Sequence, residues 1–147
     1  MPKPIRESIV SNGSHRGVVA LSIPAKAEFI VLCRLALSGL ARVRSLEPEV
    51  VADLKLALTE ACSNSIRHAY GGDRAGAVEV RYELAADRFT IDVTDGGQGF
   101  VPASEAAANG ELDEGGLGIA IIRALVDELD IDSNGVGSRL RCVKYLA

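Results

Sequence analysis

The sequence predicts an α/β protein in which strands and amphipathic helices share one core. Apolar residues alternate with charged or small residues over 78–84 and again over 89–93, which is typical of a β-hairpin. Between residues 25 and 45 the apolar side chains instead recur near helical spacing. A chain of 147 residues that is 48% hydrophobic has the size and apolar content of one ordinary domain.

The first half of the chain predicts a tail, a strand and two helices. Residues 1–16 have no periodicity and are expected to form a flexible N-terminal tail, followed by a single domain over 17–147. A β-rich run over 17–23 ends at Pro24, and a long amphipathic helix is expected over 25–45. Pro48 suits the first turn of a second helix, which should end near Gly71.

The second half predicts a hairpin, a loop, a helix and a closing hairpin. Asp95 follows the hairpin at 78–93 and therefore lies at the end of a strand. Residues 101–114 contain few large apolar groups, and a stretch of this length is commonly a lid over a ligand. A third amphipathic helix is expected over 117–129, and strands over 130–133 and 138–146.

The composition excludes several classes of function. A net charge of -4 with scattered basic residues argues against nucleic acid or an anionic membrane as the main partner. The sequence contains no apolar run near the roughly 20 residues of a membrane span and no signal-peptide core, so a cytoplasmic protein is expected. Its three cysteines share no metal-ligand spacing and are predicted to be reduced, mostly buried thiols.

Three short segments in a fixed order indicate an ATP site. In the first, Glu60 and Asn64 are four residues apart and would project from one face of a helix. In the second, Asp95 precedes glycines that allow the backbone to approach a ligand closely. In the third, glycines at 115–118 open a helix, where free N–H groups can bind phosphate oxygens.

With these segments the chain resembles the GHKL ATPases, and within them the serine-protein kinase and anti-sigma factor group typified by RsbW and SpoIIAB. The resemblance runs from about Leu21 to the C-terminus and includes the phrase Glu-Ala-x-x-Asn-x-Ile-x-His-Ala-Tyr. It implies the GHKL (Bergerat) ATP-binding fold, an α+β two-layer sandwich whose mixed, mostly antiparallel sheet has helices on one face. The order of strands and helices predicted above agrees with this fold independently.

The resemblance also implies roles for individual residues. Glu60 would be the general base that prepares an acceptor hydroxyl, and Asn64 would be the ligand to Mg²⁺. Asp95 would accept a hydrogen bond from the exocyclic amine of adenine. Ser138 stands where the family usually has Thr near the adenine, and Arg34 aligns with an arginine at the family's protein-partner surface. The remaining candidate nucleotide contacts are His68, Gly97, Gly99, Phe100, Gly115, Gly116, Leu117, Gly118 and Ile119.

Each motif also has a plainer interpretation. Glu60, Asn64 and His68 could form the solvated stripe of an amphipathic helix, and His68 could serve only in packing or hydrogen bonding at the helix end. The Asp95 tripeptide could be an ordinary turn after a strand. The glycines at 115–118 could join a loop to a helix without a ligand, and Arg34 could be an exposed helix residue.

The implied function is that of a kinase and binding protein in one. It would sequester a sigma factor and use MgATP to phosphorylate a Ser or Thr on a STAS-domain anti-sigma factor antagonist, and it is expected to be a homodimer. The alternative is an ATP-dependent binding module without significant kinase activity. A histidine kinase catalytic domain or a topoisomerase, Hsp90 or MutL-type ATPase would share the site but would need further segments to couple it to their functions.

Overall fold

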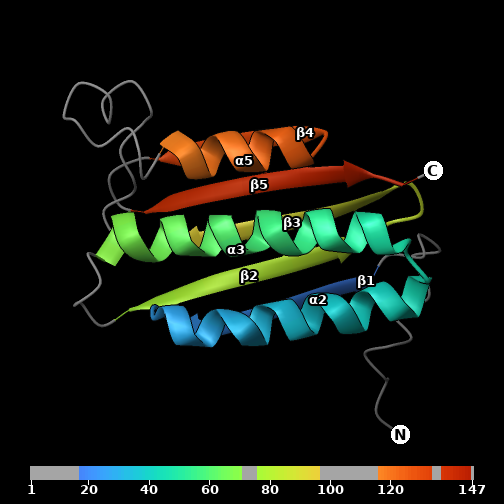
Figure 1. Cartoon of the computed structure of the whole chain (residues 1–147). Helices are drawn as coiled ribbons and strands as arrows, with labels where there is room; N and C mark the ends of the chain where they lie inside the picture. The colour runs from blue at the N-terminus through green and yellow to red at the C-terminus, as the bar shows by residue number, and fades with distance from the viewer. Residues whose placement is uncertain (1–16, 71–75, 97–115, 134–136, 147) are drawn as a thin grey trace, which may run out of the picture.

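The computed structural model describes residues 17–70, 76–96, 116–133 and 137–146. Within these ranges the chain forms a five-stranded sheet in the order β1-β2-β3-β5-β4, and every pair of neighbouring strands is antiparallel. The helices cover one face of this sheet (Figure 1). The structure therefore confirms the predicted two-layer fold class. The strands are β1 (Gly17–Pro24), β2 (Ala77–Leu84), β3 (Arg88–Asp95), β4 (Glu128–Ser133) and β5 (Ser138–Tyr145).

The helical layer consists of α2 (Ile30–Arg44), α3 (Pro48–Tyr70) and α5 (Leu117–Leu125). In Figure 1 α3 runs along the middle of the layer, between α2 and α5. The core between helices and sheet contains Leu37, Leu54, Leu58, Tyr82 and Ile122, each fully buried. Burial of large apolar side chains is the main source of folding free energy, so this central position makes α3 the best-anchored helix.

Two predicted boundaries were wrong. The first helix does not begin at residue 25, because Ala27–Phe29 forms a 3₁₀ turn (η1) and α2 starts at Ile30. The third helix does not reach residue 129. It ends at Leu125, and Val126 is extended with φ -118° and ψ 166°. From Glu128 onward the backbone groups pair with β5 in place of the hydrogen bonds that a longer helix would have made. Strand pairing therefore outweighs the helical periodicity of the local sequence.

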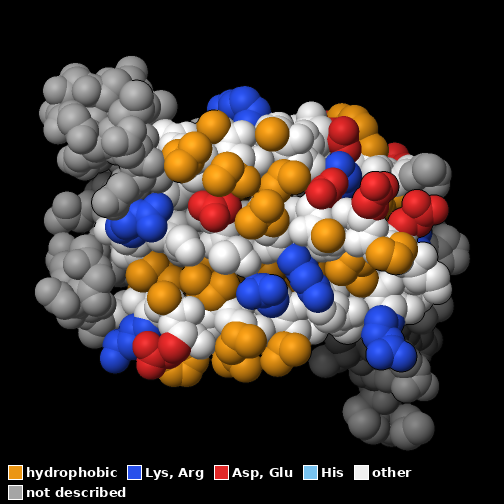
Figure 2. All heavy atoms as spheres, viewed as in Figure 1, with side chains coloured by type: hydrophobic (Ala, Val, Ile, Leu, Met, Phe, Trp, Pro, Cys, Tyr) orange, Lys and Arg blue, Asp and Glu red, His pale blue; other side chains and the backbone are white. Residues whose placement is uncertain are grey.

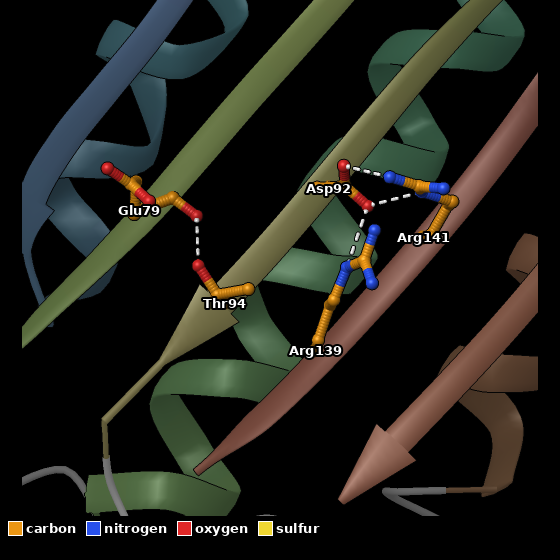
Figure 3. Close-up of polar contacts among 5 residues, drawn as sticks. All are labelled: Glu79, Asp92, Thr94, Arg139 and Arg141. Carbon is orange, nitrogen blue, oxygen red and sulfur yellow. Dashed lines mark hydrogen bonds and ion pairs between the residues drawn. The ribbon is translucent and has the colours of Figure 1, made fainter.

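The face of the sheet away from the helices carries a charged cluster (Figure 3). Asp92 on β3 accepts hydrogen bonds from Arg141 Nε at 2.8 Å, from Arg141 Nη2 at 3.0 Å and from Arg139 Nε at 3.3 Å. Burial acts to raise the pKa of Asp92, but the hydrogen bonds and charges of the two arginines outweigh it and lower the pKa below its usual value. The cluster therefore holds an ionised carboxylate at neutral pH.

The three cysteines are reduced and buried, as predicted. Burial raises the pKa of Cys142 to about 12. The hydrogen bond with Cys33 and burial both raise the pKa of Cys62. Thiols with a raised pKa are poor nucleophiles. The hydrogen bond with Cys62 instead lowers the pKa of Cys33, although all three side chains are fully buried, which agrees with a packing role.

No helix in the described part of the chain is both long enough and apolar enough to cross a membrane. The predicted tail, residues 1–16, lies outside the described residues, as does the predicted lid at 101–114.

Candidate functional site

Helix α3 presents Glu60 and Asn64 to the start of α5. Asn64 is 1% exposed and Glu60 is half-buried. A Cβ atom on Gly118 would lie 3.1 Å from both Asn64 Nδ2 and Glu60 Oε1. The first turn of α5 therefore packs directly against the two α3 side chains, and it brings the helix-opening glycine next to the carboxylate and the amide.

The amide of Asn64 is only partly satisfied. Its Oδ1 accepts a 3.0 Å hydrogen bond from Arg67 Nη2. Its Nδ2 is buried and is the one buried side-chain polar atom of the described residues that lacks a hydrogen-bond partner. Leaving a buried donor unpaired costs about 1–3 kcal/mol, so an acceptor from a bound ligand would be stabilised here. Such burial does not fit the interpretation of this residue as part of a solvated stripe.

Asp95 at the end of β3 is fixed by two hydroxyl groups. Ser65 Oγ on α3 donates to Asp95 Oδ2 at 2.6 Å, and Ser138 Oγ on β5 donates to the same oxygen at 2.5 Å. Ser138 lies directly opposite Asp95 in the β3–β5 ladder. The carboxylate is thereby held at the point where α3, β3 and β5 meet.

The turn before β5 also approaches Asp95 closely. A Cβ atom on Gly137 would lie 2.4 Å from the Asp95 carbonyl oxygen, a distance that no side chain tolerates. Glycine at this position therefore lets the backbone at residue 137 lie directly against the end of β3.

A magnesium ion fits the residues present. The described residues contain no cluster of three or more His, Cys, Asp or Glu side chains that could hold a metal on their own. Mg²⁺ is commonly bound by one or two protein oxygens together with substrate phosphates and water. Asn64 Oδ1 has a second lone pair beyond the one that Arg67 uses, so it can supply one such oxygen.

The other predicted contacts are described only in part. Gly116 occupies the N-cap position of α5, Leu117 is 61% exposed, and Ile119 packs against the core. The side chain of His68 lies outside the described residues. The predicted contacts Gly97, Gly99, Phe100 and Gly115 lie outside them as well.

Arg34 belongs to a different surface. It is exposed on α2 and has no partner within the described part of the chain. Its neighbours Val31, Leu32 and Leu35 are 51%, 44% and 61% exposed. The structure therefore places this arginine on a helix whose neighbouring positions carry uncovered apolar side chains.

Sequence reasoning missed Ser65, Arg67 and Gly137. Both Ser65 and Arg67 lie inside the first motif; Arg67 belongs to the helical stripe of Glu60 and Asn64 but received no role, and Ser65 lies off that stripe. The signal for Gly137 was weaker, because a glycine in a hairpin connection is expected for the turn alone. Its contact with Asp95 depends on β5 lying beside β3, which the local sequence does not reveal.

Comparison with known proteins agrees with this geometry. The family model of the histidine kinase-like ATPase domain matches residues 23–144. The chain is 36% identical over 140 residues to the serine-protein kinase RsbW of Bacillus pumilus, covering 88% of this chain and 86% of that protein. It is 34% identical over 137 residues to RsbW of Bacillus velezensis, covering 87% and 85%.

Solved structures share the fold at lower identity. The RsbU and RsbW domains of Rv1364c from Mycobacterium tuberculosis match with a TM-score of 0.67 and 20% identity over 87% of this chain, which spans 32% of that longer chain. A chain of the SiaB-SiaC complex from Pseudomonas aeruginosa matches with a TM-score of 0.61 and 16% identity, covering 95% of this chain and 94% of that one. On the family match and the identities to RsbW, the chain belongs to the histidine kinase-like ATPases and, within them, to the RsbW serine-protein kinases.

Proposed function

We propose that this protein uses MgATP to phosphorylate a Ser or Thr of a STAS-domain antagonist and sequesters a sigma factor when the antagonist is phosphorylated. The observation that carries the proposal is the contact of Gly118 with both Glu60 and Asn64. This contact brings a helix N-terminus that can bind phosphate next to a carboxylate and a buried, incompletely paired amide. The membership in the RsbW serine-protein kinases supports the same conclusion.

The transfer requires alignment and charge neutralisation more than covalent help from the protein. Glu60 accepts the proton of the acceptor hydroxyl while the hydroxyl oxygen forms a bond to the γ-phosphorus and the bond to ADP breaks. Backbone N–H groups at Gly116 and Gly118 hold the phosphates. Asn64 Oδ1 would hold a bound Mg²⁺, which would neutralise phosphate charge.

Asp95 selects the base. Its carboxylate accepts a hydrogen bond from the adenine amine, whereas guanine presents an oxygen at that position. Two hydroxyls on one carboxylate oxygen fix its orientation before ATP binds. Preorganisation of this kind reduces the ordering cost of binding.

The outer surface of α2 is the proposed partner surface. Arg34 shares this helix with exposed Val31, Leu32 and Leu35. Figure 2 shows hydrophobic side chains gathered along the edge of α2 that faces away from α3. Exposed apolar side chains around an arginine are typical of protein interfaces. Phosphate on the antagonist adds a charge of about -1.5 to -2 and would weaken its complex, which frees this surface for the sigma factor.

The homodimer, the cytoplasmic location and the single domain over 17–147 are part of the same proposal. They rest on the family membership and on the continuous sheet-and-helix layers of the described residues.

The test is a transfer assay combined with partner capture. Partners are captured from native lysate with MgATP and with MgADP, identified by mass spectrometry, and then incubated pure with labelled ATP. We expect a STAS protein to be phosphorylated on Ser or Thr by the wild type and not by the Glu60→Gln variant. The wild type and the variant should bind ATP equally. Stable partners without any new phosphosite would favour the binding-module alternative.

A further inference from the structure

A groove separate from the nucleotide site runs between the second half of α2 and the first half of α3. It has a volume of 630 Å³. Ala41, Leu46, Val51 and Ala52 form its apolar part, and Arg42 and Lys55 supply its charged groups. An apolar trough with a few polar groups at its rim is the general form of a binding site in a protein surface.

The two cations of the groove are not neutralised. Arg42 on α2 and Lys55 on α3 make no side-chain hydrogen bond or ion pair within the described part of the chain. Helix α2 contains no Asp or Glu. The carboxylate of Asp53 on α3 instead pairs with Lys144 Nζ on β5, at 3.5 Å.

Helical spacing explains this separation of charge. Pro48, Val51, Ala52 and Lys55 follow the i, i+3, i+4, i+7 rule and form the stripe of α3 that lines the groove. Figure 2 shows blue and orange side chains along the boundary between α2 and α3, whereas most red side chains of this view lie on the other side of α3. The groove thus has a positive rim without an acidic counterpart among its lining residues.

The local backbone fixes the shape of the groove. Ser45 ends α2 in the left-handed conformation, with φ 54° and ψ 49°, and is the only described non-glycine residue with positive φ. The Leu46 N–H then donates to the Ala41 carbonyl at 3.0 Å. This closed turn directs Leu46 back under the groove, so that the apolar floor is formed before any partner binds.

We propose that this groove docks an acidic amphipathic helix of a protein partner. Leucine-like side chains of the partner would fill the trough, and its carboxylates would pair with Arg42 and Lys55. The N-terminal tail of the chain is a poor occupant, because residues 1–16 carry Lys3, Arg6 and Arg16 against a single acidic residue. A helix laid in a groove between two helices is a recurring mode of peptide recognition.

The groove and Glu60 lie on different faces of α3. Lys55 precedes Glu60 by five residues, a rise of about 7.5 Å along α3. Five residues also turn the helix by about 140°, so the groove faces α2 whereas Glu60 faces Gly118 on α5, and a partner docked in the groove leaves the nucleotide site open. Docking itself needs neither ATP nor Glu60, so its test is independent of the proposed kinase activity.

The test uses two labelled synthetic peptides with Leu at i, i+3, i+4 and i+7. One has Glu at the intervening positions, and the other has Lys in place of every Glu. Fluorescence anisotropy with the full chain should show binding of the Glu peptide. The Arg42→Glu/Lys55→Glu variant should lose that binding by about tenfold or more and should instead bind the Lys peptide.

Two measurements keep this test specific. Arg123→Glu, which changes an exposed cation on α5, is the matched control and should bind the Glu peptide like the wild type. In NMR spectra the peptide should shift the amide signals of Leu46 and Val51. Equal binding of both peptides, loss of binding in the Arg123 variant, or shifts confined to the surface around Arg34 would each overturn the proposal.

Discussion

The Ser65 hydroxyl on α3 donates a 2.6 Å hydrogen bond to Asp95 Oδ2 at the end of β3, joining the helical layer to the sheet. Ser138 donates to the same oxygen from β5. The proposed adenine-binding carboxylate therefore has its position set by three elements of the fold. Its proposed role in binding adenine can be tested by substitutions that leave these three elements in place.

Asp95→Asn should weaken ATP binding by about 1–3 kcal/mol, the range for a lost hydrogen bond that leaves a buried group poorly paired. Asn has one accepting oxygen. If that oxygen accepts from the two serine hydroxyls, the NH₂ group faces the adenine amine, and two donors cannot pair. Isothermal titration with ATP measures the effect. Unchanged affinity would contradict the adenine role, and Ser138→Ala should have a smaller effect because the carboxylate and its bond from Ser65 remain.

Asn64→Ala should abolish phosphoryl transfer and leave the protein folded. The amide nitrogen has no partner among the described residues, so its removal eliminates the cost of an unpaired buried donor. This gain offsets part of the stability lost with the Arg67 hydrogen bond and with the packing of the side chain. Transfer assays over a range of Mg²⁺ concentrations and thermal unfolding of the ATP-free protein test both expectations. Full activity in this variant would rule out the metal assignment.

Gly137→Ala should destabilise the protein by about 1–3 kcal/mol, because the new Cβ would be placed 2.4 Å from the Asp95 carbonyl and the backbone must shift. Gly39→Ala on α2 is the matched control. A Cβ there meets nothing within 4 Å, so the better helix propensity of Ala should stabilise the protein by about 0.5–1 kcal/mol. Urea unfolding of both variants gives the comparison, and equal effects would show that the close approach is not rigid.

Asp92→Asn should destabilise the protein by about 1–3 kcal/mol at pH 7, because two arginines lose a buried carboxylate partner. The folded-state pKa of Asp92 is lowered. Its stabilisation is therefore complete above the unfolded pKa of about 3.9 and is lost as the pH falls through the lower folded value. Urea unfolding at pH 7 and in acid measures the free energy of unfolding of wild type and variant. The difference between the two free energies should be smaller in acid, and a difference that does not vary with pH would contradict this.

The sequence predicted the elements whose signal is local. The hairpin at 78–93 has strict alternation, and α3 has a proline at its first turn and glycines after its end, so both were predicted correctly. The end of α5 was missed because the apolar residues Val126 and Leu129 continue the helical spacing. Only the neighbouring β5 decides that they become a turn and the start of β4.

The candidate site was predictable to the same extent. Spacing alone placed Glu60 and Asn64 on one face of a helix, and the strand pattern placed Asp95 at a strand end. The contacts of Ser65 and Gly137 with Asp95 join residues that lie 30 and 42 positions apart in the chain. Such contacts follow from strand order, which no short motif encodes.

The position of β5 has a consequence for synthesis of the protein on the ribosome. Although β5 is the last of the described strands to be made, it is an interior strand, between β3 and β4. Until it emerges, the nascent chain has an unpaired edge on β3 and lacks Ser138, which helps to hold Asp95. The proposed adenine contact is therefore complete only once β5 has been made, and a slowed or truncated translation product would expose an edge prone to aggregation.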